Sequence, residues 1–378
     1  MKPYSLSFDD RQKVTDLLEK VKVKSENTLG YPVAKDFDYS ELMPFLHIPL
    51  NNVGDPFIES TYGVDSREME KEVVRFFAEL FRAKGDNWWG YVTNGGSEGN
   101  LYGLYLAREL HPKAMVYYSS ATHYSVQKNL NLLNMPNITI RSQENGEIDY
   151  DDLQSTIRMN RHLPAIIIAN IGTTMTEARD DVKKIKAILK DLAISNSYIH
   201  ADGALSGSYS AFLNPRPAFD FGDGADSIAI SGHKFIGSPM PCGVVVVKKS
   251  HRDRIARSIE YVGSMDTTIT GSRNGLSPLF LWYTIKKLGT EGLKQRAIHS
   301  LDVAAYAERR LNEIGVNAWR NPNSITVIFS APADIIIQKW QLASEGGWSH
   351  IICMPNVTRQ QIDELVSEIS DSRDESNG

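Results

Sequence analysis

Several features that mark whole classes of protein are missing from this 378-residue sequence. Its two cysteines, Cys242 and Cys353, are too few and too far apart for a disulfide framework or for a cysteine-based metal site. Lysine and arginine (41) do not exceed aspartate and glutamate (46), so the net charge of −5 favours neither nucleic acid nor a membrane surface as a partner. The longest apolar runs, such as 165–169, fall far below the ~20 residues of a membrane span. The first ten residues also lack the apolar stretch of a signal peptide, so we expect a cytoplasmic protein.

The order of apolar and polar residues predicts a large doubly wound α/β domain. Between residues 88 and 250, short and nearly continuous apolar runs alternate with longer amphipathic stretches. This pattern is typical of a mostly parallel sheet covered by helices on both faces. We expect strands at 115–119, 137–140, 165–170, 198–201, 227–230 and 244–247, and helices at 97–110, 124–133 and 181–193.

The last third of the chain has a different pattern. An irregular stretch at 261–277 precedes long helical stretches, two apolar runs at 325–329 and 351–354, and a final helix from Arg359. This arrangement predicts a smaller C-terminal α+β domain. We therefore divide the chain into a helical and irregular segment (1–60), a large α/β domain (61–290) and a small domain (291–378).

A glycine-rich segment near the start of the large domain is suited to an anion. Residues 93–100 are Thr-Asn-Gly-Gly-Ser-Glu-Gly-Asn and lead into the helix expected from Ser97. Glycines let the backbone come close to a phosphate, and a helix N-terminus offers free N–H groups and the positive end of its dipole. The segment matches neither a P-loop nor the dinucleotide-binding pattern. By itself it fits an ordinary glycine-rich turn equally well.

Two charged residues follow other strands of the same sheet. Lys234 comes just after an expected strand and is followed by Phe235 and Ile236, so loss of solvation would lower the pKa of its amine and favour Schiff-base chemistry. Asp202 ends another strand, where a buried carboxylate needs a cationic partner such as a pyridinium nitrogen. Each also has an ordinary explanation, a solvated surface lysine and an aspartate that caps the next segment.

His123 and the pair Thr173-Thr174 follow two further strands. His123 is placed to stack on a flat aromatic cofactor, although a lone histidine is more often a structural hydrogen-bonding group. The threonine hydroxyls could reach a polar substituent of such a ring. Ligands of open α/β sheets bind at the carboxyl ends of the strands, where all these residues are expected. A phosphate cup, a stacking imidazole, an aspartate for a pyridine nitrogen and a Schiff-base lysine are together what pyridoxal 5′-phosphate (PLP) requires.

These residues also carry a resemblance to a known family. Ser231-Gly-His-Lys234, preceded by His200-Ala-Asp-Gly-Ala204 and Ala121-Thr-His-Tyr-Ser, resembles the fold-type I, group II PLP-dependent amino-acid decarboxylases over roughly residues 30–370. The chain is most similar to their short branch of bacterial histidine decarboxylases and plant serine decarboxylases. The phrases shared with that branch include Gly30-Tyr-Pro, Phe37-Asp-Tyr, Trp89-Gly-Tyr-Val-Thr-Asn-Gly-Gly, Gly146-Glu-Ile-Asp-Tyr-Asp-Asp-Leu, Asn170-Ile-Gly-Thr-Thr and Thr270-Gly-Ser-Arg-Asn-Gly.

The resemblance implies an aspartate-aminotransferase-like fold, a homodimer with active sites at the interface, and PLP as cofactor. It implies that Lys234 is the Schiff-base lysine, that Asp202 pairs with the pyridine nitrogen and that His123 stacks on the ring. Tyr261, in the irregular stretch, is a candidate to protonate or shield the carbanion, although a packing role is the simpler interpretation. The resemblance assigns the rest of the cofactor to Gly96, Ser97, Ser231 and His233 for the phosphate, and to Thr174 and Ala204 for the ring.

The resemblance predicts α-decarboxylation of an L-amino acid to its amine, with L-histidine to histamine as first choice. Residues 51–64 and 340–343 are more similar to the serine branch, so L-serine to ethanolamine stays open. Leu276 stands where both branches carry histidine, which leaves a more apolar substrate open. Transamination, aldol cleavage and decarboxylative oxidation on the same fold are alternatives that the residues alone do not separate. A non-catalytic binding protein and a nicotinamide-dependent dehydrogenase fit the residues less well.

Overall fold

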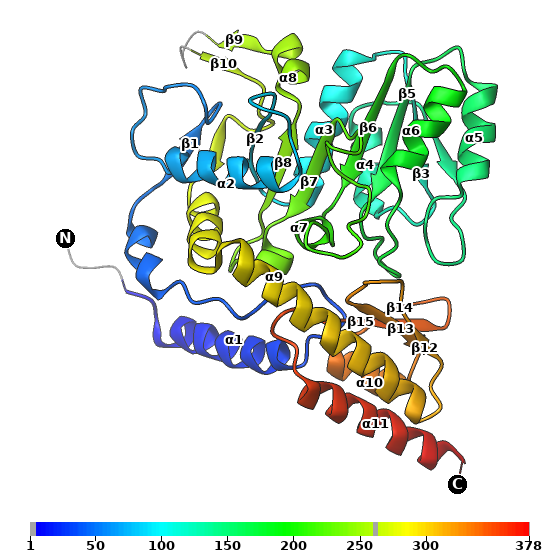
Figure 1. Ribbon diagram of the computed structural model, residues 1–378. Helices are drawn as coiled ribbons and strands as arrows, with labels where there is room; N and C mark the ends of the chain where they lie inside the picture. The colour runs from blue at the N-terminus through cyan, green and yellow to red at the C-terminus, as the bar shows by residue number, and fades with distance from the viewer. Residues whose placement is uncertain (1–4, 260–263, 378) are drawn as a thin grey trace.

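The protein has a large sheet domain and a smaller C-terminal sheet domain, with the long helix α9 (Leu276–Glu313) running from one to the other (Figure 1). The computed structural model describes residues 5–259 and 264–377. Within these two ranges, no helix is both long and apolar enough to cross a membrane. The helix α9 bends at Gly289, whose φ of 60° is in the left-handed region that favours glycine. This bend lies beside the predicted domain limit at 290, and the domain limits themselves stay a prediction.

The large sheet has seven strands in the order β2-β8-β7-β6-β5-β3-β4. Strand β8 is antiparallel to β2 and β7, and all other neighbours are parallel, which confirms the mostly parallel sheet. Alternate residues of β5 pack into two separate apolar clusters, Ile167 into one and Ile168 into the other, because helices cover both faces. The strands are β2 (Trp89–Thr93), β3 (Met115–Ser119), β4 (Asn137–Ile140), β5 (Ala165–Asn170), β6 (Ser197–Asp202), β7 (Ser227–Ser231) and β8 (Gly243–Val247).

Helices α5 and α6 of the large domain begin at aspartates that cap them. Asp149 at the start of α5 and Asp181 at the start of α6 each accept hydrogen bonds from two backbone N–H groups of the first turn. The helices that precede α9 are α1 (Phe8–Glu26), η1 (Ser40–His47), α2 (Arg67–Leu80), α3 (Gly96–Leu110), α4 (Tyr124–Leu132), α5 (Tyr150–Met159), α6 (Val182–Asp191), α7 (Gly207–Ser210), η2 (His233–Gly237) and α8 (Lys249–Ile255).

Helix α3 packs unusually close to the sheet, against β6, β7 and β8. A Cβ atom at Gly99 would lie 2.8 Å from the Cβ of Ala229, and one at Gly103 would lie 2.4 Å from Nδ1 of His200. Real side chains do not approach to such distances, so the helix can occupy this place only because these positions are glycine. The close packing brings the first turns of α3 to the ends of β6 and β7.

The small domain is built on a four-stranded antiparallel sheet in the order β12-β13-β15-β14. Figure 1 shows it beside the second half of α9, with α10 and α11 against it. This agrees with the α+β arrangement predicted for the last third of the chain. Its elements are β12 (Ala318–Trp319), β13 (Thr326–Ser330), α10 (Asp334–Trp340), β14 (Ala343–Glu345), β15 (Trp348–Ile352) and α11 (Arg359–Asn377).

The stretch predicted to be irregular at 261–277 contains two short strands, so that prediction was wrong in part. Strand β11 (Ser272–Asn274) pairs antiparallel with β1 (Asn51–Val53), and β10 (Ser264–Asp266) pairs with β9 (Arg257–Ile259). The partners of β11 lie more than 200 positions away in the sequence. A local pattern of apolar residues carries no signal for a pairing of this kind.

Candidate active site

Lys234 lies at the carboxyl end of β7, in the short helix η2 that follows the strand. The next two residues, Phe235 and Ile236, are buried. Burial lowers the pKa of the Lys234 amine, and the nearby carboxylate of Asp202 opposes this effect. A lysine with a lowered pKa is more often neutral, and the neutral amine is the form that attacks an aldehyde.

The carboxylate of Asp202 is buried at the end of β6, where the residue is only 6% exposed. One oxygen accepts a hydrogen bond from the side-chain amide of Asn100 at 2.8 Å, and the other accepts the backbone N–H of Ala204 at 3.1 Å. In the described part of the chain, no lysine, arginine or histidine forms an ion pair with it. Because a buried charge is costly without a partner, this carboxylate is suited to a cation that the protein does not itself supply.

His123 stands between β3 and α4, and its side chain caps the helix. Its Nδ1 accepts the backbone N–H of Ser125 at 3.2 Å and lies 2.8 Å from the Ser125 hydroxyl. Burial lowers the pKa of His123, Asp202 raises it and Lys234 lowers it further. The charges of Asp202 and Lys234 thus both act on the imidazole of His123. These are the three residues that sequence reasoning placed around the cofactor ring.

The start of α3 meets the end of β7 and the turn that follows β6. A Cβ atom at Gly96 would lie 2.7 Å from Oγ of Ser231 and 2.9 Å from the Cβ of Ala204. These elements can meet this closely only because residue 96 has no side chain, and we call their junction the phosphate cradle. Ser97 follows in the first turn of α3 and is exposed. A helix N-terminus beside a small cradle of this kind is suited to a phosphate.

His233, Thr173 and Thr174 were also predicted to contact the cofactor, and each lies in a different environment. Nδ1 of His233 lies 2.8 Å from the carbonyl oxygen and 3.1 Å from the amide nitrogen of Cys242, so the backbone before β8 fixes the imidazole. Thr174 is exposed in the loop after β5. The hydroxyl of buried Thr173 accepts the backbone N–H of Ala178 at 3.0 Å and is used within that loop. The roles suggested for these residues stay predictions.

The roles suggested for two further residues, one in the stretch before α9 and one at its start, also stay predictions. Tyr261 lies outside the described residues. Leu276 is half-buried and packs beside an apolar cluster that joins the N-terminal segment to α9. The buried members of that cluster are Tyr39, Leu42, Leu279 and Phe280.

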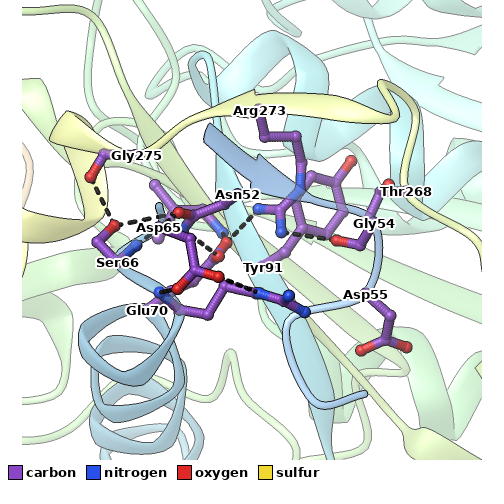
Figure 2. Close-up of polar contacts among 12 residues, drawn as sticks. Asn52, Gly54, Asp55, Asp65, Ser66, Glu70, Tyr91, Thr268, Arg273 and Gly275 are labelled. Carbon is purple, nitrogen blue, oxygen red and sulfur yellow. Dashed lines mark hydrogen bonds and ion pairs between the residues drawn. The ribbon is translucent and has the colours of Figure 1, made fainter. Parts of the chain in front are cut away.

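A second buried polar group, which we call the Glu70 cluster, consists of Glu70, Arg273, Asn52 and Tyr91. Figure 2 shows the Arg273 guanidinium between the Glu70 carboxylate, with which it forms an ion pair, and the carbonyl of Gly54, to which it donates at 2.7 Å. The guanidinium also lies over the ring of Tyr91, 5.3 Å from its centre. Asn52 donates to Glu70 at 2.7 Å. The cluster thus fastens β1 and β11 to helix α2 and strand β2.

The Glu70 cluster is connected to the phosphate cradle through Tyr91. The Tyr91 hydroxyl donates to Glu98 at 3.1 Å. The other oxygen of Glu98 accepts both the backbone N–H and the side-chain amide of Asn94, at 2.8 and 2.7 Å. Glu98 therefore fixes the conformation of the segment that leads into Gly96.

The sequence analysis missed a chain of hydrogen-bonded residues that ends at the Asp202 carboxylate. Asn100, His200 and Ser227 are buried and joined by hydrogen bonds. Two signals were available. His200 and Asp202 are two positions apart and so share one face of β6, and Asn100 lies one helical turn after Gly96 and so shares one face of α3.

A doubly wound sheet with a half-buried lysine of lowered pKa, a buried carboxylate that forms no ion pair among the described residues and a helix N-terminus at its strand ends is the arrangement of a fold-type I PLP enzyme. Residues 64–328 match the pyridoxal-dependent decarboxylase conserved domain. The chain belongs to this family of PLP-dependent amino-acid decarboxylases, which confirms the resemblance stated from its motifs.

Relatives and solved structures agree with this assignment over nearly the whole chain. The histidine decarboxylase of Mesorhizobium japonicum is 52% identical over 365 residues, which are 97% of this chain and 99% of that one. The histidine decarboxylase of Morganella morganii is 46% identical over 369 residues, which are 97% of this chain and 97% of that one. L-Methionine decarboxylase from Streptomyces sp. 590 superimposes with a TM-score of 0.88 at 26% identity, over 97% of this chain and 96% of that one. Glutamate decarboxylase from Lactobacillus brevis (TM-score 0.82, 16% identity, 99% and 94% covered) shares the fold.

PLP is the cofactor of this family, and the residues present fit it. The unpaired Asp202 carboxylate matches a protonated pyridine nitrogen, and Lys234, with its lowered pKa, matches an aldehyde. The N-terminus of α3 at Gly96, with its free backbone N–H groups, matches a phosphate. The pyridine nitrogen, the aldehyde and the phosphate of the cofactor thus each have a counterpart at the strand ends.

Proposed function

We propose that the protein decarboxylates L-histidine to histamine and CO₂, with PLP as cofactor. The observation that carries the choice of substrate is the 52% identity, over 97% of the chain, to a histidine decarboxylase. Lys234, with its lowered pKa, and the buried Asp202 supply the chemistry that such a reaction needs.

We assign the steps to residues as follows. When bound, PLP supplies an electron sink for the bond that loses CO₂. Lys234 is the amine that holds the cofactor through its aldehyde. Asp202 keeps a proton on the pyridine nitrogen, because an ionised carboxylate there stabilises the charged ring. His123, fixed by Ser125, would stack on the ring of the bound cofactor and would deliver the proton that replaces CO₂ on the substrate carbon.

The remaining contacts with the cofactor are also proposals. The phosphate is held at the N-terminus of α3 and the end of β7, and small side chains of two loops line the ring. The residues proposed for the phosphate are Gly96, Ser97, Ser231 and His233, and those for the ring are Thr174 and Ala204.

We further propose a cytoplasmic homodimer whose interface includes helix α1. This helix contributes no buried residue, yet Val14, Leu17, Leu18 and Val21 follow helical spacing and are all exposed. An apolar helix face needs a cover, and a second copy of the chain supplies one. Both cysteines are free and buried, which suits a reducing compartment. Light scattering should give twice the chain mass of 42.3 kDa, with loss of dimer in a Leu17→Asp variant; a monomeric wild type would contradict the proposal.

The reaction is tested by incubating the PLP-loaded enzyme separately with each of the twenty common L-amino acids and identifying products by mass spectrometry. We expect histamine and CO₂ from L-histidine, and none from the Lys234→Ala variant. Ethanolamine from L-serine, or an amine from an apolar amino acid only, would keep the reaction and change the substrate. A keto acid or an aldehyde would overturn the reaction class.

A further inference from the structure

The carboxylate of Asp202 is held from behind by a buried chain of three side chains. Nδ2 of Asn100 lies 2.8 Å from Oδ2 of Asp202, and Oδ1 of Asn100 lies 2.9 Å from Nε2 of His200. Nδ1 of His200 lies 2.7 Å from Oγ of Ser227. His200 and Ser227 are fully buried and Asn100 is 2% exposed. We call Asn100, His200 and Ser227 the Asp202 support.

The proton arrangement of the Asp202 support follows from the chemistry of its members. An ionised carboxylate only accepts hydrogen bonds, so the amide nitrogen of Asn100 must face Asp202 and its oxygen must face His200. That oxygen also only accepts, so Nε2 of His200 must carry a hydrogen. Burial lowers the pKa of His200 to about 4, although Asp202 raises it, so the ring is neutral near pH 7. Its Nδ1 is then bare and accepts the hydroxyl hydrogen of Ser227.

Packing leaves the imidazole of His200 little freedom to turn or leave. The ring lies against the backbone of α3 at Gly103, where even a methyl group would come within 2.4 Å of Nδ1. The same helix carries Asn100 one turn earlier. The position of the amide that contacts Asp202 is therefore set by both α3 and β6.

We propose that Asn100 and His200 are positioning residues for Asp202, which fix its carboxylate without adding a positive charge of their own to the site. The amide of Asn100 and the backbone N–H of Ala204 hold the two carboxylate oxygens in place. The histidine that orients the Asn100 amide is neutral, so it does not compete for the carboxylate. The positive partner of Asp202 is then the cofactor nitrogen alone. This inference rests on the proposed function, since it takes Asp202 as the residue that pairs with that nitrogen.

The first test measures the tautomer directly, in PLP-loaded wild-type enzyme with isotope-labelled histidine. Nitrogen NMR distinguishes the two neutral tautomers and the imidazolium, and the His200 signals are identified by their loss in His200→Gln. We expect a neutral ring with the hydrogen on Nε2 near pH 7. A hydrogen on Nδ1, or a doubly protonated ring, would overturn the proposal. This measurement needs no substrate, so it is independent of whether histidine is decarboxylated.

The second test compares variants by their PLP dissociation constants and by kcat and KM for L-histidine. We expect Asn100→Ala and His200→Leu to weaken PLP binding on the order of 10–100-fold, the range that is typical of groups that orient the ligands of a metal ion. The kcat should fall while KM stays unchanged, because the support acts on the cofactor site and not on the substrate. His200→Gln should restore most of the loss, since its amide can still donate to Asn100.

A matched pair of serines controls for general effects of changing a buried hydroxyl. Ser227→Ala removes the last member of the support and should weaken PLP binding. Ser300→Ala changes an equally buried serine in α9, whose hydroxyl has no hydrogen-bond partner within the described ranges, and should leave PLP binding unchanged. Equal PLP affinity in Asn100→Ala and wild type, with both folded, would overturn the positioning role. Absence of histamine from the wild type would instead count against the proposed function.

Discussion

The Glu70 cluster and the Asp202 site both lie against the large sheet, but among the described residues only the Glu70 carboxylate forms an ion pair with a positive side chain. In the Glu70 cluster, the carboxylate pairs with Arg273 and also accepts from Asn52 and the backbone of Val92. At Asp202, neutral donors surround the carboxylate and no cation of the described residues pairs with it. The first arrangement is complete within the protein, whereas the second becomes complete when a cation binds.

The difference separates a buried charge that supports the fold from one that serves the reaction. Breaking a complete buried pair leaves the other charge without compensation and costs stability. Removing a lone buried carboxylate relieves a desolvation cost and instead removes the group that a ligand needs. Substitutions at Asp202 should therefore lower activity more than stability, and substitutions at Glu70 should lower stability.

The largest effect is expected on turnover in Asp202→Ala. We expect kcat to fall on the order of 10²–10³-fold, because a preorganised electrostatic contact to the reacting system is lost. The urea-unfolding free energy of the cofactor-free variant should equal or exceed that of the wild type. Asp202→Asn, which keeps the shape without the charge, should lose activity as well. Wild-type turnover in either variant would contradict the claim that the Asp202 carboxylate serves the reaction.

Replacing Glu70 should act on stability. Glu70→Ala leaves Arg273 buried and unpaired, and we expect a loss of about 3–5 kcal/mol in the free energy of unfolding. The double variant Glu70→Leu with Arg273→Met should recover much of this loss, since an apolar pair has no charge to compensate. Denaturant titrations of the three proteins measure both values. A single variant as stable as the wild type would show that the pair is not a structural contact.

The buried His200 should make stability depend on pH on the acid side. Its pKa is near 6.5 in the unfolded chain and about 4 in the folded one, where burial lowers it. As pH falls from about 6.5 to 4, only the unfolded chain takes up this proton, so the free energy of unfolding falls, by roughly 3 kcal/mol for a shift of this size. His200→Gln should lose less stability than the wild type over the same window. Parallel pH profiles for the two proteins would contradict the folded-state pKa of His200.

The smallest effect is expected from an exposed ion pair on the same helix as Glu70. Lys71 lies 2.8 Å from Glu68, but the Glu68 side chain is 80% exposed. Lys71→Ala should change the free energy of unfolding by less than about 0.5 kcal/mol, since solvent screens such pairs. A change comparable with that of Glu70→Ala would show that burial does not distinguish the two pairs.

Features that depend on local sequence patterns, such as strand limits and residues at strand ends, were predicted from the sequence. Strands β3, β4 and β5 have the predicted limits, because their apolar runs are short and bounded by polar residues. Lys234, Asp202 and His123 were expected at strand ends and lie there together. Contacts between distant segments were missed. Glu70 and Arg273 are 203 positions apart in the sequence, and Asn100 and His200 are 100 positions apart. The periodicity of apolar residues carries no signal for contacts between residues so far apart.

The most direct test of the account is whether the positive partner of Asp202 is the pyridine nitrogen of PLP. Equilibrium dialysis would compare PLP with a carbocyclic analogue in which that nitrogen is replaced by C–H, in the wild type and in Asp202→Ala. We predict that the wild type prefers PLP by roughly tenfold or more, as expected for a charge-assisted hydrogen bond, and that the variant loses this preference. Equal affinities of the wild type for the two compounds, or an unchanged preference in Asp202→Ala, would contradict it.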